Sequence, residues 1–424
     1  MSRIYSVFPV FFLIIFPVSI TFLPYVHGLV VLTASGAGIY YYFIHARYSR
    51  MNNDYEKQFY FAIWFFLLVA ILVTMLAGVD AESYKKLGKF LYLLMTIPVY
   101  FYFRQVGVNY FVLWLGLVMG SIMSACVAVS DVWLGFFDSR FSGRASGILN
   151  PIIFGDLSLL LGMMSLVGID WFKTRTRLYA IFSLLAFFLG LLSSLLSQAR
   201  GGLLAIPLVL LIFIWFYSFR IERWKLGLWF VLFILLGFIL YNIPELSIER
   251  RFSLAYKQVY SYLNNDISHM SRHIGSLGIR IESWLAAWQV FIDNIYLGVG
   301  WGNYQKSVSA LVENGTRNNL VANFSHPHNQ FLSSMVSGGI LGFVAILALF
   351  ILPVSIFIRV LRSSGVSVDI RRNALIGLIM VVSFAAFNLS ESFLERSRPV
   401  AFFLFYLAVC MAGIHQKRRY FKSK

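Results

Sequence analysis

Uninterrupted apolar runs recur along most of this chain, and they constrain its fold more than any other feature. Each run is roughly 17 to 25 residues long, enough for an α-helix to cross a hydrocarbon core of about 30 Å. The 424 residues are 59% hydrophobic and only 12% charged, which lies outside the range of ordinary soluble domains. We therefore predict an all-α, polytopic integral membrane protein.

The apolar runs resolve into about twelve predicted transmembrane spans. The fourth is short for a span. The first follows Arg3 as a signal peptide would, but it lacks a clear small-residue cleavage site, so we predict a retained helix. The spans lie at about 6–23, 26–45, 59–78, 89–103, 107–133, 149–169, 178–197, 202–219, 226–241, 330–358, 373–390 and 400–414.

Basic residues outnumber acidic ones by 35 to 18, which gives a formal charge of +17. In a soluble protein this excess would suggest nucleic-acid binding, but most of these residues lie in short loops between spans, as the positive-inside rule describes. We therefore predict cytoplasmic N- and C-termini and no nucleic-acid partner. The cytoplasmic segments are then "ARYSR", "WFKTRTR", "FRIERWK", "RVLRSSGVSVDIRR" and the tail "HQKRRYFKSK".

The chain divides into three predicted parts. Residues 1–241 hold spans one to nine, 242–329 form a long outer loop, and 330–424 hold the last three spans and the basic tail. Apolar residues recur at helical spacing in two segments of the loop, which predicts two amphipathic helices against the outer mouth of the bundle. Their apolar faces are Phe252, Tyr256, Val259 and Leu263 in the first helix, and Trp284, Trp288, Phe291 and Ile295 in the second.

The segment "SHPHN" precedes the tenth predicted span. Ser325 is a suitable N-cap, and Pro327 is tolerated in a first helical turn. His328 would then lie near a helix N-terminus on the outer face, where the helix dipole keeps the imidazole neutral and able to accept a proton. It is a candidate catalytic base, and the alternative is a polar anchor at the membrane interface.

Metal binding is the other hypothesis for this segment, with His326 and His328 as half of a site. No further histidine or carboxylate cluster has suitable ligand spacing. Cys126 and Cys410 both lie inside apolar runs, so neither a disulfide nor a cysteine metal site is expected. We predict no metal and no cofactor.

Small residues follow the histidines at intervals of four. Ser334, Gly338 and Gly342 form a row that would let another helix approach closely. We therefore expect them to be structural.

Three arginines are predicted to lie on the outer side with His328. Arg200 is in the tight turn "QARGG", Arg280 lies four residues before Trp284, and Arg144 is in another outer loop. Snorkelling to lipid headgroups is the simpler interpretation for such residues. Their convergence on one side, with few acids to neutralise them, suggests an anionic ligand, and the planar guanidinium suits phosphate oxygens.

Acidic residues are scarce on that side. Glu391, Glu395 and Asp156 could each orient a substrate hydroxyl or pair with an arginine. The glycines of "LGVGWGNY" have no βαβ context, so they do not indicate a dinucleotide site. We expect this segment to be a flexible loop that brings Trp301 and Tyr304 to the site.

A neutral histidine beside arginines at the mouth of a helix bundle suits one kind of reaction. The arginines would hold a lipid-linked pyrophosphate and neutralise the charge of the leaving group. The histidine would take a proton from an attacking hydroxyl on the opposite face of the sugar, which inverts the anomeric centre.

The motifs around these residues resemble those of one family. "HN" at 328–329, followed after nine residues by "GILG", resembles the histidine signature of the O-antigen ligase and polymerase superfamily. "QARGG" around Arg200 and the segment that begins "RIESWLAAW" at Arg280 are similar to two further blocks. "GRASGILNP" around Arg144 resembles a weaker one.

The resemblance implies transfer of O-antigen from undecaprenyl pyrophosphate to lipid A–core oligosaccharide by a metal-independent, inverting enzyme. The active site would face the periplasm, in the Gram-negative inner membrane. By the matching of blocks, His328 is the base and Arg200 and Arg280 bind the pyrophosphate. Glu391 falls where members often carry an acidic residue. The supporting candidates are His326, Asn329, Glu391, Trp284 and Tyr304, with Arg144 as a further pyrophosphate ligand.

Two alternatives stay open beside the ligase. The length of the chain suits a ligase, and the large C-terminal domain of protein-glycosylating relatives is not expected, but an O-antigen polymerase or related transferase uses the same blocks. A transporter should place ionisable residues near the midplane of broken helices in related halves. Here the polar candidates gather near one face, which disfavours transport.

Overall fold

The computed structural model describes residues 2–44, 54–135, 143–169, 177–199, 201–217 and 276–415, together with Ser253, Tyr256 and Tyr260. Within these residues the chain forms helices and loops and contains no strand. Seven of the helices are long and apolar enough to cross a membrane. They are α2 (Val26–Ile44), α3 (Asp54–Ala77), α5 (Tyr110–Leu134), α8 (Arg177–Ser197), α15 (Gln330–Arg362), α16 (Val368–Phe387) and α17 (Ser397–His415).

The remaining helices are shorter or less apolar. They are α1 (Ser2–Ser19), α4 (Ala81–Val106), α6 (Pro151–Ser165), η3 (Gly202–Leu204), α9 (Ala205–Tyr217), α13 (Ser276–Asp293), α14 (Tyr304–Glu313), η5 (Asn319–Asn323) and η6 (Phe393–Glu395). An all-helical protein with several candidate membrane spans is therefore confirmed. The span predicted at 226–241 lies outside the described residues, and the total of twelve stays a prediction.

Helix starts follow local capping chemistry. Asp80 accepts a hydrogen bond from the backbone N–H of Ser83 at the start of α4 (2.7 Å), and Asn109 caps α5 in the same way. Asn150 caps α6, whose first residue is Pro151, a residue that has no N–H to leave unsatisfied. These polar side chains mark the ends of otherwise apolar segments.

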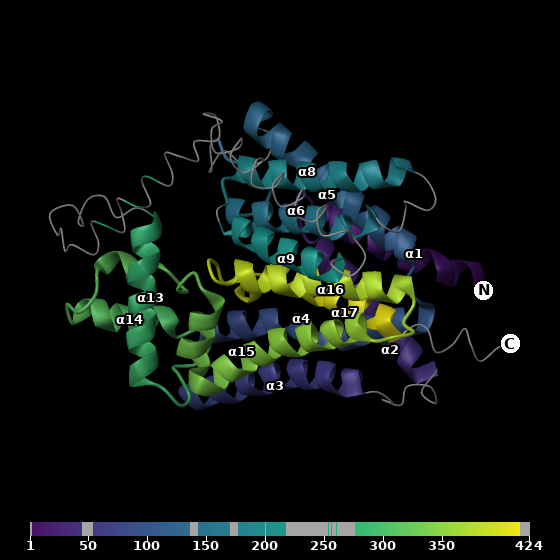
Figure 1. Ribbon diagram of the computed structural model, residues 1–424. Helices are drawn as coiled ribbons and strands as arrows, with labels where there is room; N and C mark the ends of the chain where they lie inside the picture. Colours follow the sequence, from purple (N-terminus) through teal and green to yellow (C-terminus); the bar gives the residue numbers. More distant parts are fainter. Residues whose placement is uncertain are drawn as a thin grey trace.

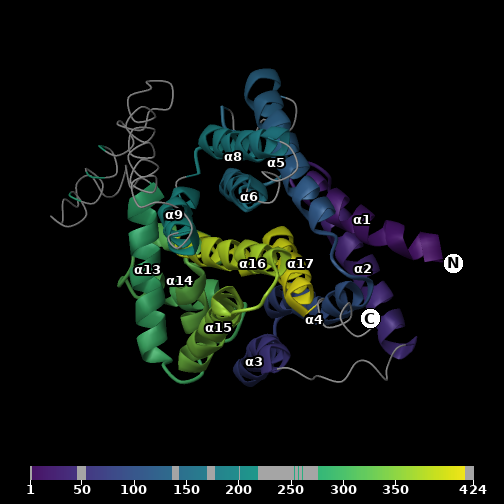
Figure 2. The same cartoon turned by 45° about the vertical axis from the view of Figure 1, so that its right-hand side comes forward.

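The two C-terminal helices form the centre of the bundle. α16 and α17 are the most buried of the candidate spans, and α16 packs against α15, α17 and α9 while α17 packs against α4. Figure 2 shows them between a group formed by α5, α6 and α8 and a second group formed by α3 and α15. Their sequences are apolar on every face, as expected for helices surrounded by protein.

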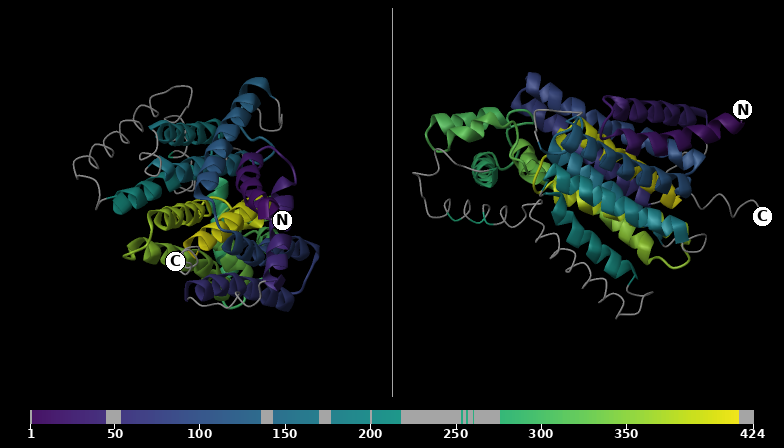
Figure 3. Two further views of the ribbon diagram at one scale, coloured as in Figure 1. Left: turned by 90° about the vertical axis from the view of Figure 1, so that its right-hand side faces the viewer. Right: turned by 90° about the horizontal axis from the view of Figure 1, so that it is seen from above.

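The described part of the predicted outer loop lies at one end of the bundle. α13 runs across the direction of the long helices, with α14 beside it, and α1 begins at the opposite end (Figure 1). The view from above shows the same separation (Figure 3). The arrangement matches a loop that covers one mouth of the bundle.

α13 is the second of the two predicted amphipathic helices, and its buried face matches the predicted one in part. Phe291 of the predicted stripe is buried together with Ala286, Ala287 and Val290, whereas Trp288 of that stripe is 49% exposed. The small alanines allow close packing, which an apolar stripe chosen by size alone does not reveal. The first predicted amphipathic helix lies mostly outside the described residues; of its face only Tyr256 is described, and it is exposed.

α15 is broken at Gly339, which has φ 59° and ψ −149°. A straight helix would separate Phe331 from Phe350 by roughly 28 Å, yet their ring centroids are 5.9 Å apart. The short arm (330–338) therefore folds back against the long arm (340–362). His328, which precedes the short arm, is held beside the bundle helices by this fold-back.

The loop between α13 and α14 satisfies the backbone groups that the break frees. Val299 and Gly300 donate to the carbonyl oxygens of Val336 and Ser337, both at 2.9 Å, and Ile340 donates to the carbonyl of Ile295 at 2.7 Å. Unpaired backbone groups are costly in a membrane protein interior. The break is thus stable only because the 295–300 segment lies against it.

The glycines after His328 have a different role from the predicted one. An added Cβ on Gly338 would lie 2.6 Å from the indole of Trp301, and one on Gly342 would meet the carbonyl of Ser334 in the short arm. These glycines are structural, as expected, but the neighbours that they admit are Trp301 and the short arm of α15, where a separate helix was expected.

Substituting Gly339 should destabilise the fold more than its backbone angle alone predicts. An alanine there is strained at positive φ, by about 1–2 kcal/mol, and its Cβ would also lie 2.5 Å from the carbonyl carbon of Tyr296. Gly365→Ala is the matched control, because Gly365 has φ +74° with no atom within 4 Å. In thermal unfolding of the detergent-solubilised protein, we expect Gly339→Ala to lower Tm at least twice as far as Gly365→Ala. Equal shifts would contradict the fold-back.

Candidate active site

The backbone of the histidine segment is strained at His328. This residue has φ 52°, in the left-handed region, which costs a non-glycine residue roughly 1–3 kcal/mol. Its N–H donates to His326 Nδ1 at 3.3 Å. The N-cap of α15 is Asn329, whose side chain accepts from the N–H groups of Phe331 (3.0 Å) and Leu332 (3.1 Å). The expectation that Ser325 caps this helix was therefore wrong, although His328 does lie at a helix N-terminus.

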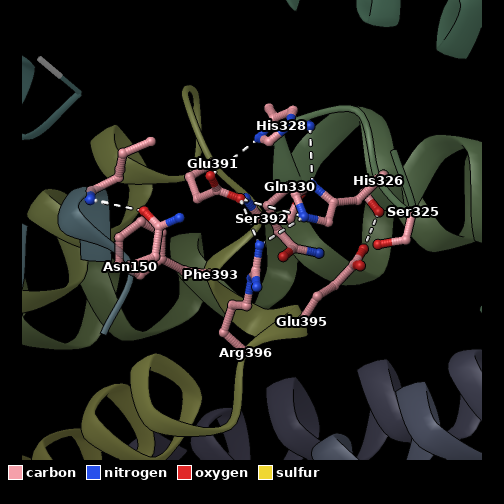
Figure 4. A network of polar contacts seen from close by, with 12 residues as sticks. Asn150, Ser325, His326, His328, Gln330, Glu391, Ser392, Phe393, Glu395 and Arg396 are labelled. Carbon is pink, nitrogen blue, oxygen red and sulfur yellow. Dashed lines mark hydrogen bonds and ion pairs between the residues drawn. The ribbon is translucent and has the colours of Figure 1, made fainter. Parts of the chain in front are cut away.

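His328 is paired with a carboxylate from the loop between α16 and α17. Its Nδ1 lies 3.1 Å from Oε2 of Glu391, whose side chain is 2% exposed. An ionised carboxylate only accepts hydrogen bonds, so Nδ1 carries the proton and Nε2 holds the lone pair. Within the described part of the chain, Nε2 makes no hydrogen bond, and the ring is partly exposed. Figure 4 shows Glu391 between His328 and Arg396.

The surroundings keep Glu391 ionised. Burial alone would raise its pKa, but the hydrogen bond with His328 and attraction to His326, His328 and Arg396 outweigh burial and lower the pKa to about 2. A carboxylate that is ionised at every physiological pH can orient the neighbouring imidazole and stabilise its protonated form.

His326 is buried beside this pair and stays neutral. Burial lowers its pKa to about 3 against the attraction of Glu391, with repulsion from His328, Lys86 and Arg396 acting in the same direction as burial. Arg396 Nη2 lies 3.2 Å from its Nε2, while the N–H of His328 reaches its Nδ1. A neutral imidazole has only one accepting nitrogen, so only one of these two donors can be satisfied at a time.

A second buried acid lies next to Glu391. Asp156 of α6 is fully buried, interacts electrostatically with Glu391 and Arg280, and lies against the turn between α8 and α9, where an added Cβ on Gly202 would meet its carboxylate. Gly201 in the same turn lies against Ser390. The structure therefore brings Arg280 of α13 and the glycines of "QARGG" to the neighbourhood of Glu391.

A buried ion pair lies beside the histidine segment. Lys86 of α4 pairs with Glu395 of η6, which also accepts from the hydroxyl of Ser333 in the short arm. Lys86 lies 3.4 Å from the carbonyl oxygen of Ser325 as well. These contacts fix the histidine segment between α4, α15 and η6.

The remaining predicted site residues make contacts of their own. Arg144 donates to the carbonyl of Ser197 (3.1 Å), at the turn that follows α8. Trp284 is partly buried on α13, and Tyr304 is buried in a separate cluster with its hydroxyl directed at the carbonyl of Ser283 (3.4 Å). Trp301 is buried too, so "LGVGWGNY" packs into the fold where a flexible loop was expected. Arg200 lies outside the described residues.

The same side chains include a possible metal site. Ligand atoms of His326, His328 and Glu391 all lie within 4.8 Å of one another. However, Arg396 Nη2 is 3.2 Å from His326 Nε2 and 4.0 Å from Glu391 Oε1. This fixed positive charge opposes a cation between them. The arrangement is better described as a histidine ring oriented by a carboxylate.

Sequence reasoning did not predict Lys86 or Arg396 as site residues. A signal existed for the lysine, because Lys85, Lys86 and Lys89 lie at the predicted outer end of a span, where the positive-inside rule expects few basic residues. Arg396 carried no comparable signal, because its contact is with His326, which lies 70 residues earlier in the chain.

Comparisons with known proteins agree with these observations. The family model described as "O-Antigen ligase" matches residues 185–347, a range that includes Arg200, Arg280 and His328 and ends before Glu391. The match supports membership of the O-antigen ligase and polymerase superfamily, as the motifs predicted. A Haemophilus influenzae protein described as uncharacterized is 24% identical over 381 residues, covering 89% of this chain and 91% of its own.

His326 should make stability depend on pH. Because its pKa falls from 6.5 to about 3 on folding, the unfolded chain binds a proton that the folded chain does not, and stability decreases as pH falls below about 6.5. We expect His326→Gln to flatten the decrease of Tm between pH 6.5 and 4.5. Glu391→Gln is the control: the pKa of Glu391 falls from 4.5 to about 2, so its stabilisation is lost only below pH 4.5. An unchanged slope for His326→Gln would show that His326 is protonated in the folded state.

Proposed function

We propose that this chain is an O-antigen ligase of the Gram-negative inner membrane, with cytoplasmic termini and an active site that faces the periplasm. It transfers polysaccharide from undecaprenyl pyrophosphate to lipid A–core oligosaccharide. The observation that carries the proposal is the hydrogen bond between His328 Nδ1 and Glu391 Oε2, at 3.1 Å. It supports a base whose Nε2 can accept a proton at the N-terminus of a folded-back helix.

His328 acts as the general base. A hydroxyl of the acceptor loses its proton to Nε2 as its oxygen forms a bond to the anomeric carbon of the donor sugar. Glu391 holds the ring in the required tautomer and stabilises the imidazolium that forms, as in other base–carboxylate pairs. The proton then passes from His328 to solvent.

Arginines stabilise the leaving group. The bond from the anomeric carbon to the phosphate oxygen breaks, and the electron pair stays on the lipid pyrophosphate, so negative charge develops there. The electrostatic interaction of Arg280 with Asp156, which also interacts with Glu391, supports this role for Arg280, and we assign Arg200 and Arg144 to the same role from the matched motifs. Attack from the face opposite the pyrophosphate inverts the sugar, and no step requires a metal.

The test uses purified protein with undecaprenyl-pyrophosphate O-antigen, lipid A–core and EDTA. A new lipid A–core band that carries glycan would support the ligase. Longer lipid-linked chains without transfer to the core would identify a polymerase, and the absence of any new bond with competent substrates would overturn both and favour transport.

Removing the base or its partner should in each case lower activity strongly. We expect His328→Ala to lower kcat by about 10²–10⁴-fold, the usual range for a general base. Glu391→Gln should lower it by up to about 10⁴-fold, because the amide can donate to Nδ1 and leave the ring proton on Nε2, which is the wrong tautomer. The matched control is Glu313→Gln, at an exposed position at the end of α14, which should keep wild-type activity. Glycan transfer is measured by gel band shift, and wild-type rates for His328→Ala would refute the assignment.

A further inference from the structure

Three cations lie near one another at the end of the bundle that holds the histidine segment. Lys89 is partly exposed at the predicted outer end of a span, Arg396 directly precedes α17, and Arg398 is in the first turn of α17. The positive-inside rule expects few basic residues on this side, and the dipole of α17 disfavours a cation in its first turn. We call these three residues the basic face.

The basic face has little negative charge to neutralise it. Within the described residues, neither Lys89 nor Arg398 forms an ion pair with a carboxylate, and Arg398 Nη1 donates to the carbonyl oxygen of Ile148 at 3.1 Å. Lys89 and Arg396 repel each other. The positive charge of this face is therefore available to an anion from outside the chain.

The cations from α4 and α17 reach the same side of the bundle, where α2, α4 and α17 pack against one another. Arg398 interacts electrostatically with His27 at the start of α2. The ring of His27 stacks on that of Tyr92, with 6.3 Å between centroids. Tyr92 follows Lys89 by three residues on α4, so the two side chains are neighbours on one helix face.

An exposed aromatic residue adjoins the basic face. Tyr25 precedes α2, interacts electrostatically with Arg398 and is 83% exposed. Its φ is 63°, in the left-handed region, where a non-glycine residue is strained, and such strain is concentrated at ligand-binding sites. A tyrosine held in this way offers both an apolar ring and a hydroxyl to a ligand.

Glu391 connects the basic face to the candidate active site. Arg396 Nη2 lies 4.0 Å from Glu391 Oε1. The arginine assigned to the donor, Arg280 of α13, interacts instead with Asp156 of α6. Different helices thus build the two sets of cations, as two separate anionic substrates would require.

We propose that the basic face, with Tyr25, binds the phosphorylated sugar headgroup of the lipid acceptor. The inference rests on the proposed function, because it assigns the lipid A half of that acceptor. Guanidinium and ammonium groups suit phosphate oxygens, and the ring of Tyr25 suits the apolar face of a sugar. Lys89 lies where a predicted span meets the membrane surface, which is the depth of a lipid headgroup.

The experiment compares two lipid A–core acceptors, one with its lipid A phosphates and one from which a phosphatase has removed them. Lys89→Gln removes one charge of the basic face, and Arg398→Gln is a second variant in case the first does not fold. Lys85→Gln is the matched control, one helical turn from Lys89, because Lys85 is exposed and paired with Glu82. We measure kcat/KM for each acceptor, KM for the donor, and binding of both forms of core-free lipid A to protein in phosphatidylcholine nanodiscs.

We expect Lys89→Gln and Arg398→Gln to lower the ratio of phosphorylated to dephosphorylated acceptor kcat/KM at least tenfold. They should weaken binding of phosphorylated lipid A at least tenfold and leave KM for the donor within twofold of wild type. Lys85→Gln should keep the wild-type values.

Unchanged acceptor and lipid A ratios in a folded variant would overturn the proposal and show that these cations contact bulk headgroups. A raised donor KM with unchanged acceptor ratios would assign the basic face to the donor pyrophosphate and overturn it too. If wild-type protein transfers no glycan but binds phosphorylated lipid A through Lys89, the proposed reaction fails while the headgroup assignment stands.

Discussion

The backbone pairing at the break of α15 is the constraint on which the site depends. A helix that stops inside a membrane protein frees carbonyl and N–H groups that no water can reach, so it needs other backbone to satisfy them. The 295–300 segment supplies these partners. As a result, the segment after α13 and the short arm of α15 form one unit. These main-chain hydrogen bonds position His328 independently of its side-chain contacts.

The buried charges around His328 are arranged in pairs that join distant parts of the chain. Glu391 faces His328, and Lys86 faces Glu395. A buried charge is stable only with a partner, and removing one member of a pair is far more destabilising than the pair itself is stabilising. The same pairs that set the chemistry therefore also hold α4, α15 and the loop before α17 together.

Much of the fold was predictable from sequence, because span length and apolar periodicity are local properties. The helices α2, α5, α8 and α17 start and end close to the predicted positions. The position of a histidine at a helix N-terminus was also predictable from "SHPHN". The pairing of His328 with Glu391 was not, because those residues are 63 positions apart and no periodic signal connects them.

The errors share a physical cause. The glycines after His328 and the aromatic residues of "LGVGWGNY" were interpreted separately, as a helix contact and as a flexible loop. In the structure these glycines and aromatic residues are in contact, because the indole of Trp301 fills the space that Gly338 leaves open. Serine and asparagine both cap helices well, so residue type alone did not distinguish Ser325 from Asn329, the observed N-cap. The left-handed backbone of His328, which shifts the helix start to Gln330, leaves no signature in sequence.

The pairing of the 295–300 segment with the broken helix constrains how the sequence of this protein can evolve. The contacts are made by main chain, so they restrict the number of residues between Ile295 and Gly300 more strictly than their identities, except where glycine is needed. One inserted residue would move every donor out of register with its acceptor and release the arm that carries His328. We therefore expect the amino-acid sequence of this loop to vary among related chains while its length is preserved.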